Sequence, residues 1–395
     1  MKKTIFALAV AALFGFSGAL LTAAEDPSEA TVLKLTGSVK VLLPGQSVAT
    51  DLHVGDKVPQ GATITTGLGS EVYLQPFVGT VSSIKENATV VVEKLTVTTQ
   101  DGVVKKQNAL LNLKGGNLVS NIDPSKRAIN NYGVRTPKGV AAARGTSYSV
   151  SVSGGGFSIM ASADSVTFTM PDGNTFRISQ GMITITAPGQ APQPAVPLAS
   201  VAVGNPAVTA MVQQAVTTFS AMVANNLGGL SAGDTAQLAA QVAGVASAAL
   251  PSQASALTAQ IVTAVTSPNS AASVAAAAAP AGGTTTQVAD AISSITAAAA
   301  TAAPQEAAAI ASAAATAAPA DAGAIVAAVT LAVPGSNDNG ALTQSVATAT
   351  GQTVEHVTQQ TTQASAQATQ AVQQTQEAVI TVITPIDTST VSPNH

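Results

Sequence analysis

Ser82 and Lys85 are the residues whose spacing most resembles that of a catalytic pair. A Ser-x-x-Lys pattern supplies the nucleophile and a lysine in serine acyl-enzymes. Here the pair falls in a β-rich run, where residues three positions apart point to opposite faces. The Ser-Asp-Asn and Lys-Thr-Gly segments that accompany the pattern in that class are missing. We therefore expect no catalytic role for this pair.

Metal ligands and cofactor-binding motifs are equally sparse. The histidines, His53, His356 and His395, are far apart in the sequence, and the chain contains no cysteine. Asp51 and Asp56 flank the stretch LHVG, but a surface turn explains them more simply than a calcium site. The absence of cysteine excludes disulfides and thiolate chemistry. We expect no metal, no cofactor and no catalytic residue, and therefore no enzyme.

Arg144 is the charged residue whose surroundings are most unusual, because it lies between an alanine run and an alternating stretch in VRTPKGVAAARGTSYSV. Pro137 favours an extended conformation at Thr136, and Gly139 and Gly145 allow a tight backbone. A guanidinium carries five donors in a rigid fork, which can hold carbonyls or a carboxylate. We expect Arg144 to act as a structural pin that ties the following strand to a neighbouring loop. The alternatives are that it recognises an anionic ligand or partner, or that it has no special role.

Short strands are the elements that must position these residues. The run TSYSVSVS at 146–153 alternates apolar residues with serine, as a strand with one buried face does. PDGN at 171–174 favours a turn between two further β-rich runs, which predicts a hairpin. Turn residues separate many other short runs of this kind. The pattern predicts a mostly β domain at 25–186, an antiparallel β-sandwich or roll.

Three stretches of this region resemble the FecR domain, the extracytoplasmic domain of FecR regulators and of many bacterial envelope proteins. They are LTGSVKVL at 35–42, HVGDKVPQGATITTGLGSEVYL at 53–74, and TPKGVAAARGTSYSV at 136–150. Their order and spacing make the resemblance more specific than one short motif. We expect the signature residues to be structural; they are Gly55, Asp56, Gly61, Thr66, Gly67, Thr136, Pro137, Gly139, Arg144, Gly145 and Thr146.

The resemblance covers the domain and not the whole regulator. FecR regulators carry a cytoplasmic, sigma-factor-controlling segment and a transmembrane helix before this domain. Here residues 1–24 read instead as a signal peptide, with Lys2 and Lys3 before an apolar run and small residues up to Ala24. We expect cleavage after Ala24 and a periplasmic or secreted protein with no transmembrane segment in the mature chain. An uncleaved membrane anchor is the alternative.

The charges divide the chain into two parts. All 16 lysines and arginines lie at or before Arg177, whereas residues 187–395 contain eight acidic residues and no basic one. Such a distribution lacks the basic surface that nucleic-acid binding requires, so we expect no nucleic-acid partner.

The second part is rich in alanine and is predicted to be helical or partly disordered. Residues 187–204 read as a Pro-rich linker, and residues 205–352 as short helices separated by prolines, three of them evenly spaced at 304, 319 and 334. We favour a packed array of short helices because the near absence of charge differs from the usual composition of disordered chains. A low-complexity chain without a fixed fold is the alternative.

The segment 353–384 has small residues at heptad spacing between Val354 and Val382, and residues 385–395 form a tail. Alternating steps of three and four indicate a helical seam. Such a seam could dock on the alanine-rich helices or support weak self-association through 354–382.

These observations predict a non-enzymatic envelope protein. Its FecR-like β domain would be a recognition or scaffold module on an alanine-rich helical spacer or assembly region, with an unknown envelope protein or glycan as partner. The alternative is an extracytoplasmic sensor domain that feeds a regulatory pathway through a separate membrane partner.

Overall fold

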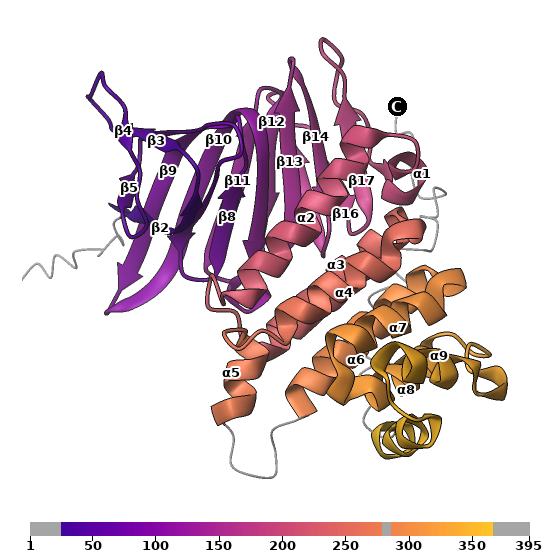
Figure 1. The fold of residues 1–395 in the computed structure, drawn as a ribbon. Coiled ribbons are helices and arrows are strands. Elements are labelled where there is room, and N and C mark those ends of the chain that lie inside the picture. Colours follow the sequence, from indigo (N-terminus) through magenta and orange to yellow (C-terminus); the bar gives the residue numbers. More distant parts are fainter. Residues whose placement is uncertain (1–24, 279–285, 366–395) are drawn as a thin grey trace, which may run out of the picture.

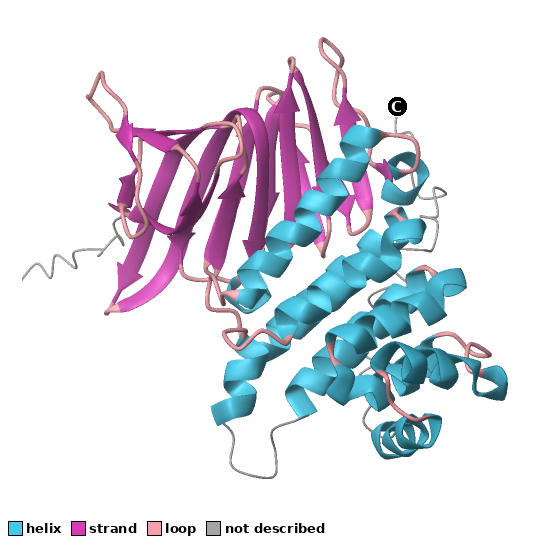
Figure 2. Cartoon of the chain, viewed as in Figure 1, coloured by secondary structure: helices cyan, strands magenta, loops and turns pink. Residues whose placement is uncertain are grey.

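A computed structural model describes residues 25–278 and 286–365, and it consists of a β part followed by a helical part (Figures 1 and 2). The strands form two facing sheets, and the helices lie against one side of them. This order matches the predicted fold class. The expected signal peptide, the end of the heptad segment and the tail lie outside the described residues.

The two sheets, here called sheet A and sheet B, share the long strand β10 (Val103–Ile122). Sheet A also contains β1 (Glu25–Pro27), β3 (Val39–Leu42), β4 (Thr50–Asp51), β6 (Thr63–Thr66), β9 (Thr89–Gln100), β11 (Asn130–Thr136), β12 (Gly139–Ala143), β15 (Ser165–Thr169) and β16 (Thr175–Ser179). Sheet B contains β2 (Glu29–Thr36), β5 (Lys57–Pro59), β7 (Glu71–Phe77), β8 (Thr80–Ile84), β13 (Ser147–Ser153), β14 (Gly156–Ala161), β17 (Met182–Thr186) and β18 (Val196–Pro197).

β10 passes from one sheet to the other at Gly116. Its first half pairs with β9 and β11, its second half with β8 and β13, and the strand pairing closes on itself in this way. Gly116 has φ +91°, and a Cβ there would lie 2.5 Å from Ala88. Only glycine combines this backbone conformation with such a close approach.

One strand pair differs from the antiparallel arrangement predicted from the sequence. β10 and β11 run parallel, from Gln107 opposite Asn130 to Asn112 opposite Arg135. The cause is the connection through the 3₁₀ turn η1 (Pro124–Lys126), which returns the chain from the end of β10 to a point beside its beginning. The sheet is therefore mixed.

The space between the sheets holds a core of large side chains. Tyr132, Tyr148 and Phe168 are fully buried in it, and the ring of Phe168 stacks on that of Phe157 at 5.1 Å between centroids. The predicted inner face of β13 is confirmed, since Tyr148, Val150 and Val152 belong to this core, but the strand is not exposed on its other face, where Ser147 and Ser149 are buried as well. The predicted hairpin is also confirmed, because β15 and β16 pair around the turn at 171–174.

The outer face of sheet B is covered by α2 (Pro206–Ala224) (Figure 1). Met222 of this helix packs against Tyr73 and Val81, and its sulfur accepts a hydrogen bond from Asn121 Nδ2 at 2.8 Å. α2 is long and apolar enough to cross a membrane, but about half of it, 56%, is buried against the rest of the protein. Its composition therefore reflects its position between the sheet and the other helices.

The segment expected to be a linker contributes to this packing. Within residues 187–204, β18 pairs with β17, and α1 (Leu198–Ala202) follows directly. The amide of Leu198 donates a hydrogen bond to the carbonyl of Gly181 at 2.8 Å, and its side chain is buried in the helical core. These contacts attach the start of the helical part to the end of sheet B.

The helices from α2 onward, apart from α5, form two layers. One layer contains α2, α4 (Ala254–Val265), α7 (Ala307–Ala317) and α9 (Ala341–Thr350); the other contains α3 (Ala232–Ala249), α6 (Thr286–Ala302), α8 (Ala322–Ala332) and a helix over residues 354–365. α5 (Ala271–Ala278) lies between α4 and α6 in the sequence, and η5 (Asp338–Gly340) precedes α9. Alanine is the commonest residue in their shared core. The packed array is thus the one of the two sequence alternatives that the structure forms.

The same proline turn joins α3 to α4, α6 to α7, and α7 to α8. The residue before each proline has nearly identical dihedral angles: φ −132°, ψ 68° at Leu250, φ −133°, ψ 69° at Ala303, and φ −138°, ψ 72° at Ala318. The 3₁₀ turns η2 (Pro251–Gln253), η3 (Pro304–Glu306) and η4 (Pro319–Asp321) follow. Proline suits this place because it lacks an N–H and favours an extended residue before it.

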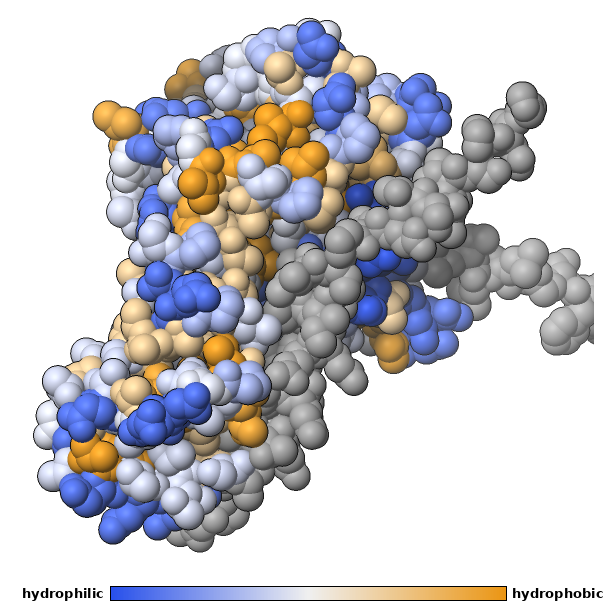
Figure 3. Space-filling model, turned by 90° about the vertical axis from the view of Figure 1, so that its right-hand side faces the viewer, coloured by the Kyte–Doolittle hydropathy of each residue, from blue (hydrophilic) through white to orange (hydrophobic). Residues whose placement is uncertain are grey.

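On the face that Figure 3 shows, hydrophobic residues gather in a band down the middle of the visible surface, and hydrophilic residues lie around it. The first turns of the heptad segment also dock on the array: Val357 is buried in its core, and Gln360 lies against Gly323 of α8. The rest of that segment lies outside the described residues. The self-association expected from it remains a prediction.

Candidate functional site

Arg144 does not act as the pin that the sequence predicted. Its side chain is exposed and makes no hydrogen bond or ion pair with any residue that the structure describes. Gly145, with φ +80°, lies against Pro124, where a Cβ would be 2.5 Å from Pro124 Cα. Glycine is therefore required at 145, whereas the neighbouring Arg144 faces solvent.

The fixing contact is instead made by the next residue, Thr146. It is fully buried, and its hydroxyl donates a hydrogen bond to the carbonyl of Ala163. Its own carbonyl accepts a hydrogen bond from the amide of Ile122 at 2.9 Å. Thr146 therefore links three chain segments at the point where the chain passes from sheet A to sheet B.

The other signature residues shape separate turns and do not gather at one site. Asp56 accepts a hydrogen bond from the amide of His53 at 2.8 Å, and Gly55 has φ +92° in the same turn. Thr66 is buried and accepts a hydrogen bond from the amide of Ala88 at 2.9 Å. The rest also lie at turns: Gly61 beside Pro44, Gly67 bound to Ser38, and Thr136, Pro137 and Gly139 in the β11–β12 turn.

The residues with enzyme-like spacing have structural partners. Ser82 Oγ lies 2.6 Å from Tyr132 Oη inside the sandwich core, whereas Lys85 Nζ lies 2.5 Å from Glu71 Oε1. The burial of Glu71 opposes its ionisation, but the charge and hydrogen bond of Lys85 outweigh this effect and lower the pKa of Glu71. Within the described ranges, no three His, Cys, Asp or Glu residues are placed to share a metal ion.

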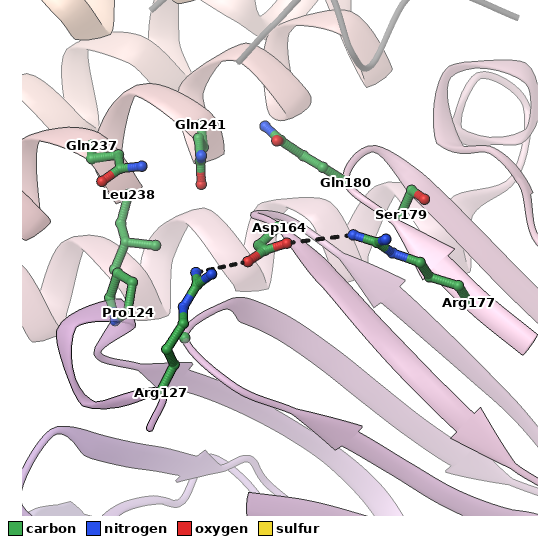
Figure 4. A pocket seen from close by; sticks show the side chains of 10 residues that line it. Pro124, Arg127, Asp164, Arg177, Ser179, Gln180, Gln237, Leu238 and Gln241 are labelled. Atoms are coloured by element: carbon green, nitrogen blue, oxygen red, sulfur yellow. Dashed lines mark hydrogen bonds and ion pairs between the residues drawn. The ribbon is translucent and has the colours of Figure 1, made fainter. Parts of the chain in front are cut away.

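A polar pocket lies where the chain repeatedly crosses between the sheets and α3 covers the crossing points. We call it the crossover pocket; its volume is about 280 Å³ (Figure 4). Four connections between the sheets contribute to it, together with the first half of α3. The lining residues are Pro124, Arg127, Gly145, Asp164, Arg177, Ser179, Gln180, Gln237, Leu238 and Gln241.

Asp164 lies between two arginines in this pocket (Figure 4). Arg127 Nη2 donates a hydrogen bond to Asp164 Oδ2 at 3.1 Å, and Arg177 Nη2 lies 3.8 Å from Asp164 Oδ1. Asp164 adopts φ +48°, a conformation that few residues other than glycine, asparagine and aspartate accept. One carboxylate therefore faces two guanidinium groups, and the pocket has a net charge of about +1.

Most of the other polar groups in the pocket are unpaired. Ser179, Gln180, Gln237 and Gln241 make no side-chain hydrogen bond to any residue in the described part of the chain. Arg177 has only its long contact with Asp164. Guanidinium, amide and hydroxyl groups bind polar ligands, but they are poor proton donors or acceptors near neutral pH. This arrangement suits recognition better than catalysis.

The sequence predicted a residue beside this pocket but none of its charged residues. Arg144 was singled out, and its neighbour Gly145 lines the pocket, whereas Arg127 and Arg177 were not predicted. Arg127 follows η1 and Arg177 lies in the middle of β16, so no local pattern relates the two arginines. A usable signal was the spacing of Gln237 and Gln241, which share one helix face four residues apart.

Comparison with known proteins identifies the β part. The family model of the FecR protein matches residues 62–167, so the chain carries a FecR domain, as the sequence resemblance predicted. No curated protein matches the chain. Two crystal structures of a candidate anti-sigma factor from Parabacteroides distasonis ATCC 8503 are similar at 14% and 15% identity, each with a TM-score of 0.27. The similar region covers 34% of this chain and 57% of each of those chains.

Proposed function

We propose that this FecR-domain chain is an exported, non-enzymatic regulatory protein that recognises an envelope ligand or partner through the crossover pocket. The observation that carries the proposal is the double origin of the pocket. Arg127 and Asp164 belong to the matched FecR region at 62–167, whereas Arg177 and the α3 glutamines lie beyond it. A ligand held there would contact the FecR domain and the helical array together.

The nature of the polar groups supports recognition rather than an enzymatic activity. The FecR match is to a regulatory, non-enzymatic family. The pocket combines guanidinium, carboxylate, amide and hydroxyl groups, and the carboxylate already accepts a hydrogen bond from Arg127. A passive scaffold would not require several unpaired polar groups facing one cavity, so the pocket favours a sensor over a spacer.

The proposed location follows from the first 24 residues. Their basic, apolar and small residues have the order of a cleavable signal peptide, which would place the mature chain in the periplasm or outside the cell. A sensor in that place would pass its signal through a separate membrane protein. N-terminal sequencing of the exported chain should begin at Glu25, and a mature protein that retains residues 1–24 would contradict the location.

The recognition role can be tested by cross-linking on intact cells. The tagged full chain and two double variants, Arg127→Gln with Arg177→Gln and Lys105→Gln with Lys106→Gln, would be purified after cross-linking. The lysine pair is the matched control because it is exposed and lies outside the pocket. We expect a main envelope partner whose capture falls about tenfold only in the arginine variant, a loss of roughly 1.4 kcal/mol. Equal capture by all three chains would favour a passive scaffold.

A further inference from the structure

We infer that the crossover pocket binds the carboxylate of a small, singly charged ligand that carries hydroxyl or amide groups beside that carboxylate. The inference deepens the proposed function and rests on it, since it assumes that the pocket recognises a ligand. It depends on three features of the pocket: its charge, its unpaired amides and its size.

The charge favours one negative charge over two. Arg127 and Arg177 face a single fixed carboxylate, Asp164, so one positive charge remains uncompensated. The 3.8 Å separation between Arg177 and Asp164 leaves the guanidinium fork of Arg177 available. This fork matches the two oxygens of a carboxylate. A phosphate dianion would be attracted by the same arginines but repelled more strongly by Asp164.

The unpaired groups specify what should lie next to the carboxylate. Gln237 and Gln241 approach from α3, while Ser179 and Gln180 approach from the crossover between β16 and β17 (Figure 4). Each amide offers donors and an acceptor, and each hydroxyl offers both. Such groups pair well with ligand hydroxyls or amides, whereas an apolar ligand would leave them unsatisfied.

The volume limits the ligand to about one residue. The pocket measures about 280 Å³, close to the lower end of the range of roughly 300–1,000 Å³ typical of ligand sites. A monosaccharide with a carboxylate or the last residue of a peptide has this size and this chemistry. Both kinds of ligand carry a carboxylate beside polar groups, so they can be distinguished only by measuring the binding of each one separately.

Binding at this place would also stabilise the contact between the two parts of the protein. Leu238 of α3 and Pro124 of η1 line the same pocket, so a ligand would add bonds across the boundary between helix and sandwich. A ligand that binds the folded form alone raises its stability by mass action. The melting temperature of the whole chain should therefore rise with ligand concentration.

Calorimetric titration of the full chain provides the test. The probes are D-glucuronate for the sugar source, N-acetyl-alanyl-alanine for the peptide source, D-glucose as the uncharged analogue, and inorganic phosphate. We expect one of the two carboxylates to bind at least about tenfold tighter than glucose and phosphate, and to raise the melting temperature. Arg177→Gln and Gln241→Ala should each weaken that binding, while Lys105→Gln with Lys106→Gln should not.

Several results would overturn the inference. These are binding of glucose or phosphate as tight as that of both carboxylates, no binding of either carboxylate, or carboxylate binding that survives Arg177→Gln in a variant with unchanged circular dichroism. If no carboxylate binds but capture of the envelope partner still depends on the two arginines, this inference fails and the proposed function stands. Loss of both would count against the pocket as a recognition site altogether.

Discussion

The sandwich and the helical array both bury a core, but the two cores differ in their share of aromatic and alanine side chains. The sandwich core contains fully buried aromatic residues, among them Tyr132, Tyr148 and Phe168, beside its valines, leucines and isoleucines. In the array core alanine is the commonest residue, the others are mostly valine, isoleucine and leucine, and aromatic residues are rare. A buried phenylalanine removes far more apolar area from water than an alanine does. Single large contacts therefore matter more in the sandwich, and the close approach of small residues matters more in the array.

This difference predicts opposite sensitivities to side-chain size. Truncating a large residue should damage the sandwich, since a cavity remains. In the array, enlarging a small residue at a helix contact should do the damage, because close-packed helices must move apart. The two parts can be followed separately in one experiment. The chain has no tryptophan, and all three tyrosines lie in the sandwich, so tyrosine fluorescence reports the sandwich and circular dichroism at 222 nm mainly the helices.

The largest effect should come from Phe168→Ala. Phe168 is fully buried, with Phe157 at 5.1 Å and Phe176 at 5.4 Å between ring centroids. Its truncation should lower the free energy of unfolding by about 3–5 kcal/mol. The measurement is urea denaturation followed by tyrosine fluorescence. Phe176→Ala is the control, because Phe176 is only partly buried and should cost clearly less. Equal losses for the two variants would contradict the large-residue account of the sandwich.

Gly323→Ala should show the reverse sensitivity in the array. A Cβ on Gly323 would lie 2.3 Å from the backbone of Gln360, so α8 and the helix over 354–365 must separate. We expect a loss of about 1–3 kcal/mol, detected at 222 nm.

The same substitution in α3 provides the control. A Cβ on Gly233 would have only Ser231 Oγ near it, at 3.9 Å. Gly233→Ala should therefore stabilise the chain by about 0.4–1 kcal/mol, because alanine favours the helix. If both glycines respond with the same sign, close helix packing is not what limits the array.

The third prediction compares two neighbouring residues of the signature. Thr146→Val removes the buried hydrogen bond to Ala163 and should cost about 1–3 kcal/mol. Arg144→Ala removes an exposed, unpaired side chain and should change the stability by no more than about 0.5 kcal/mol. Thermal melts of the full chain decide between them. A larger loss of stability for Arg144→Ala than for Thr146→Val would support the structural role of Arg144 that the sequence predicted.

The smallest effect concerns pH, and its sign should differ between the two parts. In the sandwich, the pKa of Glu71 is lowered because Lys85 outweighs the effect of burial, so this pair stabilises above the unfolded pKa and is lost as the pH falls through the folded one. In the array, burial raises the pKa of Asp290 and Asp321. The cost of burying these two carboxylates in their charged form is therefore relieved as the pH falls.

Urea denaturation at about pH 6 and about pH 4, a range that spans ordinary carboxyl pKa values, would measure both responses. The tyrosine midpoint should fall relative to the midpoint at 222 nm as the pH is lowered. Glu71→Gln should reduce the fall of the tyrosine midpoint. Parallel shifts of both midpoints in the unmodified chain would contradict the prediction.

The sequence predicted local features of the fold better than contacts between distant segments. Alternation identified the inner face of β13, and a turn motif identified the hairpin of β15 and β16, because both signals depend on neighbouring residues. The helical cover was missed because Ser147 and Ser149 resemble a solvent-facing side, yet both are buried, with no hydrogen bond to their hydroxyls in the described part of the chain. Serine is small enough to lie under a helix as well as in water.

The pocket was missed for a related reason. Its charged residues, Arg127, Asp164 and Arg177, are far apart in the sequence and meet only because the chain crosses between the sheets at one end. The parallel pairing of β10 and β11 depends on the same crossovers. Periodicity within a strand carries no information on where its ends will lie.

The repeat of the same proline turn at Pro304 and Pro319 has a consequence for how the array can change in length. Each unit places its helix in the layer opposite to the previous one: α6 in one, α7 in the other, α8 again in the first. Gain or loss of one unit would therefore invert the layer of every helix after it, and two units would restore it. Gain or loss of an even number of units should therefore be tolerated, because it keeps the helix that docks on Gly323 in its layer. Gain or loss of an odd number should displace that helix.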